Sequence, residues 1–222
     1  MNPVLSLLET RVLGVLSEKQ HTVPDSYPLT LNSLVSGCNQ KNSRDPVMEA
    51  SETEVQAAID RLKTLSLVIE SSGGRVMRYA QNTGKVLAIP PQSVALLATL
   101  FLRGSQTAGE LRINSDRLHK FGDILAVEGF LNEMAERAGG ALVRELARQP
   151  GARETRWAHL ISGEPVVPAG APAASRGSSP AEAVGASELA ALRANVDRLE
   201  AEVADIREKL ARVCRELGIT GF

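Results

Sequence analysis

The chain has 222 residues, with 25 basic and 26 acidic side chains and a formal net charge of −1. This balance excludes a polycation of the histone or ribosomal type, and the aromatic content of 3% disfavours modules that bind single strands by base stacking. The start of the sequence lacks the basic region of a signal peptide. The apolar run around residues 94–102 is too short to span a bilayer. We therefore expect a cytoplasmic protein with no membrane partner.

Residues 1–83 predict three helices followed by a β-hairpin. Apolar side chains recur at helical spacing over residues 5–20, 30–40 and 55–65, with Glu9, Arg11 and Glu18 off the apolar face of the first helix. Ser51 and Glu54 form a capping box before the third helix. Two short strands, 67–70 and 76–79, flank a Ser-Ser-Gly-Gly turn. This order is typical of a winged helix-turn-helix domain.

Residues 84–163 predict the same order a second time. A helix opens at Pro90-Pro91, a capping box joins Thr107 to Glu110, and Asp123 caps a third helix. Strands at 142–146 and 155–160 then bracket a turn that contains Pro150. The predicted fold is α+β, mainly α with small β-hairpins, arranged as tandem winged helix-turn-helix domains.

The remaining sequence predicts a flexible linker followed by a coiled-coil helix. Residues 164–186 are rich in Pro, Ala, Gly and Ser and indicate a flexible linker. Residues 187–218 carry an unbroken heptad pattern, which favours a coiled-coil homodimer over a helix that packs back on its own domain. The seam residues are Leu189, Leu192, Val196, Leu199, Val203, Ile206, Leu210, Val213 and Leu217. Light scattering of a chain without residues 187–222 distinguishes these alternatives. Only the coiled-coil homodimer predicts that the deletion converts a dimer to a monomer.

Four segments together resemble the YceH-like family of uncharacterised bacterial proteins. They are Cys38-Asn39-Gln40-Lys41-Asn42-Ser43-Arg44-Asp45-Pro46-Val47, Gln106-Thr107-Ala108-Gly109-Glu110-Leu111-Arg112, Arg148-Gln149-Pro150-Gly151 and Trp157-Ala158-His159-Leu160. The resemblance covers residues 4–163 and implies tandem winged-helix domains. It implies neither an activity nor site residues.

The sequence carries no recognisable catalytic motif. Cys38 and Cys214 form no CxxC pair, and the three histidines have no ligand spacing. We therefore expect a protein that is not an enzyme and has no cofactor and no metal. The polar segment 39–46 has two interpretations: a loop bonded to its own backbone, or a surface for phosphates or a protein partner.

Duplex DNA is the partner that the predicted fold favours. The candidate contacts are Arg61, Lys63, Arg75, Arg78, Arg144, Arg148, Arg153 and Arg156, on the third helix and first wing and on the second hairpin. Acidic side chains on both third helices oppose this interpretation, and the net charges of residues 1–84, 85–163 and 164–222 are only −1, +2 and −2. The alternative is a protein–protein interaction scaffold, because a fold does not fix a function.

Overall fold

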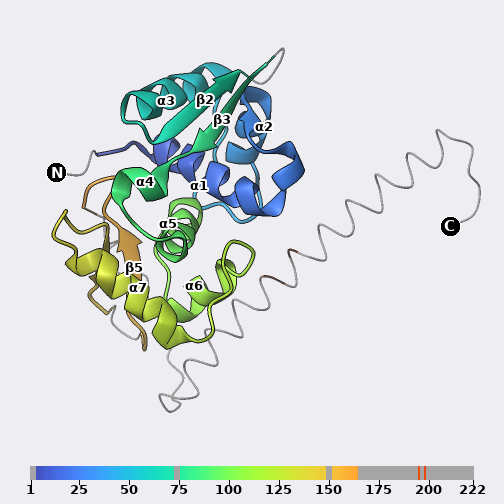
Figure 1. Cartoon of the computed structure of the whole chain (residues 1–222). Coiled ribbons are helices and arrows are strands. Elements are labelled where there is room, and N and C mark those ends of the chain that lie inside the picture. The colour runs from blue at the N-terminus through green and yellow to red at the C-terminus, as the bar shows by residue number, and fades with distance from the viewer. Residues whose placement is uncertain (1–3, 73–75, 149–151, 165–194, 196–197, 199–222) are drawn as a thin grey trace, which may run out of the picture.

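The computed structural model describes residues 4–72, 76–148, 152–164, 195 and 198. The first half contains α1 (Leu7–Thr22), the 3-10 turn η1 (Pro24–Ser26), β1 (Leu29–Thr30), α2 (Leu31–Cys38), α3 (Glu52–Thr64), β2 (Val68–Ser72) and β3 (Met77–Gln81). The second half contains α4 (Thr83–Leu87), α5 (Pro91–Arg103), α6 (Ala108–Asn114), α7 (Ile124–Glu136), β4 (Val143–Leu146) and β5 (Arg156–His159) (Figure 1). The described chain thus combines helices with small antiparallel sheets, as the α+β prediction requires.

Local side-chain chemistry sets the starts of the helices. Ser51 and Thr107 each accept the backbone N–H three residues on, and the glutamate at that position returns a hydrogen bond to the cap. Asp123 accepts the N–H of Ala126 at 2.8 Å at the start of α7. These three predicted caps are confirmed, and Ser6 forms a further capping box at α1.

The two halves share one order of elements. In the first half, β1 precedes α2 and pairs with β3, giving the strand order β1-β3-β2. In the second half, Gln106 precedes α6 and forms an isolated bridge to Trp157 in β5, which pairs with β4. Apart from α4, which precedes α5, each half therefore runs helix, short pairing segment, helix, helix and hairpin. The short pairing segments were not predicted, because two residues are too few to show a period.

Helices α1 and α5 form the centre of the molecule and join the halves. Side chains from both halves belong to one hydrophobic cluster that extends from Leu5 to Ile161. A Cβ at Gly14 in α1 would lie 2.8 Å from the Cγ of Leu102 in α5, so this glycine permits the close approach of the two helices. The backbone N–H of Leu5 also donates to the carbonyl of Ile161 at 2.8 Å.

The burial of α1 corrects the prediction for its charged side chains. Glu9 is 4% exposed and Arg11 is fully buried, although both lie off the apolar face in the sequence pattern. The physical reason is that α2 and α3 cover one side of α1 while α5 covers another. Arg11 donates from Nη1 to the Cys38 carbonyl at 3.2 Å and from Nη2 to the Pro46 carbonyl at 2.7 Å. A one-sided helical pattern cannot reveal a second covering layer.

The contact between α1 and α2 yields a stability prediction. A Cβ at Gly37 would lie 2.5 Å from Cγ1 of Val15, whereas a Cβ at Gly129 on α7 would meet nothing within 4 Å. We expect Gly37→Ala to lower the unfolding free energy by about 1–3 kcal/mol through overpacking. Gly129→Ala is the matched control and should raise it by roughly 0.5–1 kcal/mol. Urea denaturation measures both, and equal effects would refute the tight contact.

Several sequence predictions fall outside the described residues. These are the linker, the nine seam residues of the predicted coil, Arg75 and the turns of both hairpins. Self-association through residues 187–218 therefore stays a prediction. Within the described part, no helix combines the length and the apolar character needed to cross a bilayer.

Candidate nucleic-acid interface

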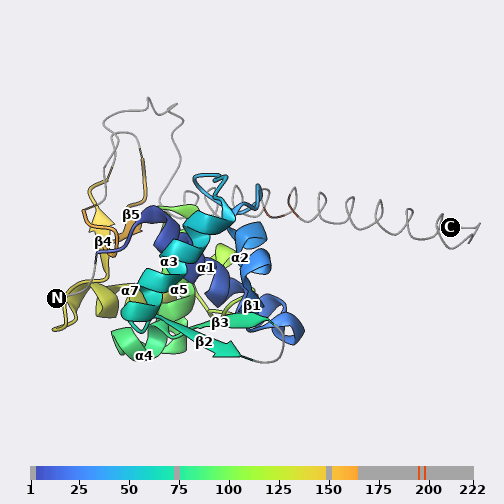
Figure 2. The ribbon, with the colours of Figure 1, turned by 90° about the horizontal axis from the view of Figure 1, so that it is seen from above.

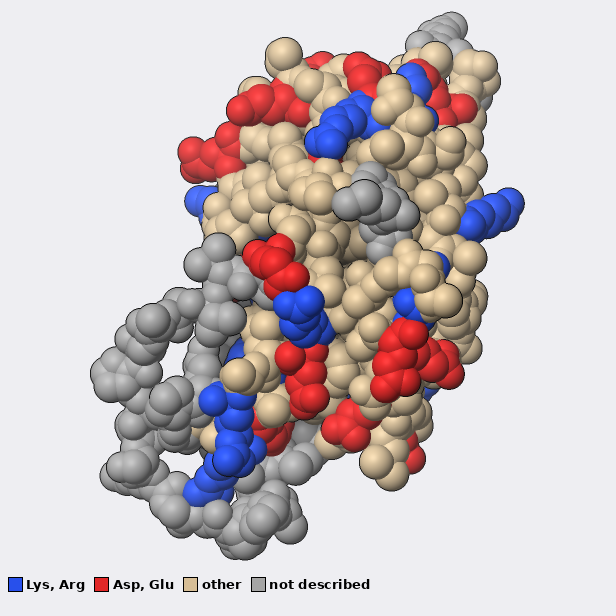
Figure 3. All heavy atoms as spheres, turned by 90° about the vertical axis from the view of Figure 1, so that its left-hand side faces the viewer, with Lys and Arg blue, Asp and Glu red and all other residues tan. Residues whose placement is uncertain are grey.

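The β4–β5 hairpin gathers four of the eight candidate contacts. Arg144 lies on β4 and Arg156 on β5, while Arg148 and Arg153 flank the hairpin turn and are exposed. The register pairs Arg144 with Ala158 and Leu146 with Arg156, so Arg144 and Arg156 project from the same face of the hairpin. A strip of basic side chains runs along this side of the molecule (Figure 3).

Arg144 and Arg156 form ion pairs at the base of the hairpin. Arg144 forms an exposed ion pair with Glu164. Arg156 donates to the Ser105 carbonyl at 2.9 Å and to Glu110 at 2.8 Å, which anchors β5 to the start of α6. Arg148 forms no hydrogen bond or ion pair with the described residues, and its side chain is exposed.

A groove of about 300 Å³ lies between this hairpin and the helices beside it. Its walls come from the first turn of α6, from Ile124 and Glu128 on α7, and from Arg148, Arg153 and Trp157 on the hairpin. Glutamates therefore share the rim with the arginines. The exposed Glu133 and Glu136 continue the acidic character along α7, which disfavours the approach of a phosphate to this helix.

The candidate contacts of the first half are held by internal partners. Arg61 donates from Nη1 to the buried carboxylate of Glu9 at 3.0 Å and from Nη2 to the Val4 carbonyl at 3.0 Å. Arg78 donates to the carbonyls of Ser26 and Pro28, at 3.3 and 2.8 Å, and so fixes the turn before β1.

Lys63 is also engaged. It forms ion pairs with Glu70 on β2 and with Asp60, the latter at 3.7 Å. The hydrogen bond to Glu70 raises the pKa of the Lys63 ammonium above its ordinary value. The exposed face of α3 adds Glu52, Glu54 and Asp60. In the first half, the positive charges that the sequence offers are therefore largely balanced within the molecule.

The two hairpins lie on opposite sides of the helical centre (Figures 1 and 2). Seen from above, β4–β5 stands at the far side of α1 and α5, and β2–β3 lies at the near side (Figure 2). The structure thus brings together the arginines of the second hairpin, whereas Lys63 and Arg78 contact or belong to the β2–β3 hairpin. Arg61 donates to the Val4 carbonyl, and the adjacent Leu5 donates to Ile161, which follows β5.

Comparison with known proteins places this chain in a family. Residues 5–152 match the family described as "Protein of unknown function, DUF480". The chain belongs to this family. A UPF0502 protein of Dechloromonas aromatica is 56% identical over 214 residues, which cover 96% of this chain and 98% of that protein. A UPF0502 protein of Methylibium petroleiphilum is 57% identical over 216 residues, or 97% and 91% of the two chains.

These relatives confirm the resemblance to an uncharacterised family, here DUF480/UPF0502, while the YceH-like name itself stays a prediction from the sequence. They also extend it, because the sequence resemblance covered only residues 4–163. Alignments over 214 and 216 residues of a 222-residue chain must include most of the C-terminal segment. The DUF480/UPF0502 relatives therefore share that segment as well as the folded halves.

The polar segment 39–46 makes internal contacts that its sequence does not specify. The side-chain amide of Asn39 brackets Ala50, accepting its N–H at 2.7 Å and donating to its carbonyl at 2.8 Å. Arg44 is buried and bonds Glu18 on α1. The loop interpretation of Asn39 is thus supported by its contacts.

The described residues include no group of three or more His, Cys, Asp or Glu side chains that could hold a metal ion.

Proposed function

We propose that this DUF480/UPF0502 protein is a non-enzymatic, duplex-DNA-binding protein built from two winged-helix domains, residues 1–83 and 84–163. The repeated order of elements supports the proposal, because each half pairs a helix-turn-helix arrangement with a C-terminal hairpin. Winged-helix domains commonly place a helix in the major groove and a hairpin against the backbone. This support comes from the architecture and is an analogy at the level of the fold.

The β4–β5 hairpin is the proposed main contact with DNA. Its four arginines are the observation that carries this assignment, and Arg148 and Arg153 at the exposed end are best placed to meet phosphates. Guanidinium groups match phosphate oxygens in a bidentate geometry. Phosphate contacts of this kind position a protein on a duplex without selecting a sequence. Binding is therefore expected to be weakly sequence-dependent.

The third helices have a smaller role in this proposal than in sequence-reading winged-helix proteins. Acidic side chains occupy the exposed faces of α3 and α7, and Arg61 and Lys63 neutralise Glu9 and Glu70. If Arg61 or Lys63 bound a phosphate instead, the carboxylate of Glu9 or Glu70 would lose its partner. The internal ion pairs thus compete with DNA at α3.

Fluorescence anisotropy with labelled duplexes of differing sequence tests the proposal. Neutralisation of two to four phosphates predicts that log K falls with log salt concentration with a slope of roughly −2 to −4. Different sequences should bind with similar affinity. A chain that binds no duplex at low salt would end the DNA proposal.

A protein-interaction scaffold is the second candidate, and one observation favours it. Leu125 on α7 is 75% exposed and neighbours Ile124, which lines the groove beside the hairpin. A groove whose walls combine apolar side chains such as Ile124 and Trp157 with charged ones suits a protein segment. Capture of partners from a native lysate with and without nuclease separates the candidates, since nuclease would release partners only if DNA holds them.

A further inference from the structure

Helix α7 has one face that no described part of the chain covers. The helix contacts α5, α6 and β4, and its buried side chains are Val127, Leu131 and Met134. The other side of α7 lies on the outside of the second half (Figure 1). Its exposed residues are Leu125, Gly129, Asn132, Glu133 and Glu136. Because they recur at spacings of three and four residues, they form one stripe along the helix, which we name the outer face of α7.

Leu125 and Gly129 lie one turn apart on the outer face of α7. Leu125 is 75% exposed, the largest exposed fraction among the large apolar side chains of the described residues. A Cβ at Gly129 would meet nothing within 4 Å, so no neighbouring atom requires a glycine there. Glycine lowers the stability of a helix interior relative to alanine. What glycine provides is a gap in the layer of side chains, into which another backbone can approach closely.

The charge of α7 is entirely negative. The helix contains Glu128, Glu133 and Glu136 and no Lys or Arg. Among the described residues, none of these three carboxylates forms a hydrogen bond or an ion pair. Glu133 and Glu136 lie in the last turn, where the helix dipole favours positive charge. The two carboxylates therefore oppose the dipole of their own helix.

Helix α3, which occupies the same place in the first half, provides the comparison. Its glutamates Glu52 and Glu54 lie in the first turn, where the dipole favours negative charge. Arg61 and Lys63 lie in its last turn. The charges of α3 thus suit an isolated surface helix, whereas those of α7 call for positive charge from outside the described chain.

We propose that the outer face of α7 binds an amphipathic helix of a partner protein, with Lys or Arg on both flanks of its apolar stripe. The positions of Leu125, Gly129, Asn132 and Glu136 repeat at four, three and four residues, which is the spacing through which two helices pack along a common seam. An apolar side chain of the partner would pack on Leu125, and its backbone would approach Gly129. Its basic side chains would pair with the free carboxylates of α7.

Charge also decides against two other occupants. A second copy of this face would bring the glutamates of two α7 helices together, and a DNA backbone would bring phosphates to them. The inference is separate from the DNA contact proposed for the β4–β5 hairpin. It gives the protein-interaction candidate a defined surface and a partner of defined chemistry.

Fluorescence anisotropy of the full chain with labelled synthetic helices tests the proposal. The probe is a three-heptad peptide with Leu at a and d and Lys at e and g, and the control peptide has Glu at e and g. We expect saturable binding of the Lys peptide, with the Glu peptide at least about tenfold weaker.

Gly129→Leu distinguishes a fitted surface from general attraction. It should raise Kd of the Lys peptide at least about tenfold because it fills the gap, although it keeps the charge and adds apolar area. Leu125→Ser should weaken binding to a similar extent through loss of the apolar contact. Ala57→Leu, at an exposed position of α3, is the matched control and should leave Kd unchanged. All three positions are exposed, and circular dichroism checks that the variants fold.

A pair of double variants tests the charge. Glu133→Gln with Glu136→Gln should weaken binding of the Lys peptide at least about fivefold. Glu49→Gln with Glu52→Gln removes the same charge from exposed positions at the start of α3 and should retain the affinity.

Four results would overturn the proposal: no saturable binding of the Lys peptide, equal affinity for the Glu peptide, an unchanged Kd in Gly129→Leu, or equal weakening in both double variants. A lower mass of Leu125→Ser in light scattering would assign the face to a second copy and also overturn it. Loss of peptide binding with duplex binding intact would refute the α7 surface alone. The reverse result would refute the hairpin alone.

Discussion

Replacement of Arg44 by Met is expected to lower the unfolding free energy by about 3–5 kcal/mol, because it leaves a partly buried carboxylate without its partner. The Arg44 side chain is fully buried, and its Nη2 lies 2.6 Å from Glu18 Oε2 and 2.8 Å from Gln40 Oε1. Its Nε also donates to the Gly37 carbonyl at 3.2 Å. This side chain therefore joins α1, α2 and the following loop.

Urea denaturation at neutral pH measures the loss, with Arg148→Met as the matched control on an exposed site. The control should change stability by less than about 0.5 kcal/mol. Arg44→Met combined with Glu18→Leu should recover part of the loss, because it removes the carboxylate that the single variant leaves unpaired. A loss below about 1 kcal/mol in Arg44→Met would contradict the role given to this ion pair.

The pH dependence of stability tests whether the Arg44–Glu18 ion pair stabilises the folded chain. Burial raises the pKa of Glu18, but the hydrogen bond and charge of Arg44 outweigh burial and hold the pKa below its ordinary value of 4.5. A depressed pKa contributes stability that is present above pH 4.5 and lost as pH falls through the folded-state value. The stability difference between the natural chain and Arg44→Met should therefore narrow below pH 4.5.

Charge reversal at the end of the hairpin is expected to have the largest effect on binding. Arg148→Glu with Arg153→Glu should abolish retention on duplex DNA, a loss of at least roughly tenfold in affinity at low salt. Two proposed phosphate contacts become two repulsive carboxylates. Because both side chains are exposed, the fold should be unaffected, and circular dichroism checks this.

Lys41→Glu with Lys120→Glu is the control for net charge. Both lysines are exposed, and the double substitution changes the net charge by the same amount as the hairpin variant. We expect this control to retain most of the duplex affinity. Equal weakening in both variants would mean that binding follows overall charge and that the hairpin is no specific contact.

The helix starts were predictable because their signals are local. Ser51, Thr107 and Asp123 each bond a backbone group within the first turn of the helix that they cap, so a few residues of sequence contain the whole interaction. Both hairpins were predictable for the same reason, since their strands are neighbours in the chain. Strand β1 was not, because its two residues depend on β3 almost 50 positions later.

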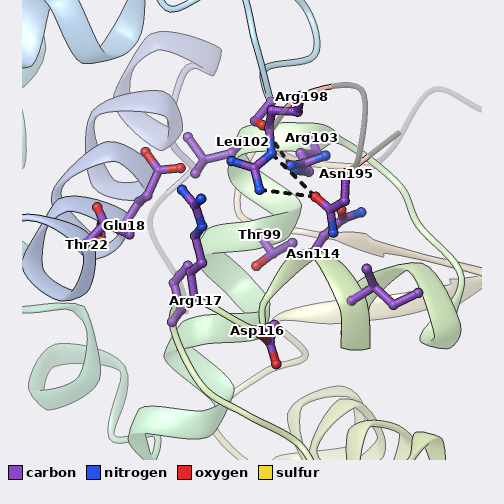
Figure 4. A pocket seen from close by; sticks show the side chains of 13 residues that line it. Glu18, Thr22, Thr99, Leu102, Arg103, Asn114, Asp116, Arg117, Asn195 and Arg198 are labelled. Carbon is purple, nitrogen blue, oxygen red and sulfur yellow. Dashed lines mark hydrogen bonds between the residues drawn. The ribbon is translucent and has the colours of Figure 1, made fainter. Parts of the chain in front are cut away.

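The chemistry of the candidate site was harder to predict, because charge counts do not show which partners the fold supplies. Arg61 meets Glu9 across 52 positions, and Arg156 meets Glu110 across 46. Both arginines look available in the sequence and are engaged in the structure. Conversely, Arg44 lies in a polar loop typical of a surface and is fully buried. A cleft of about 240 Å³ lined by Glu18, Arg103 and Arg117 also depends on packing, because these side chains come from separate segments of the chain (Figure 4).

Amide hydrogen exchange of the full chain with and without a duplex tests the central claim most directly, because it reports both binding and its location. The account predicts slower exchange on addition of DNA in residues 143–148 and 152–159, with little change in α3 or the β2–β3 hairpin. An unchanged pattern, or protection centred on α3, would contradict the assignment of the β4–β5 hairpin as the contact with DNA.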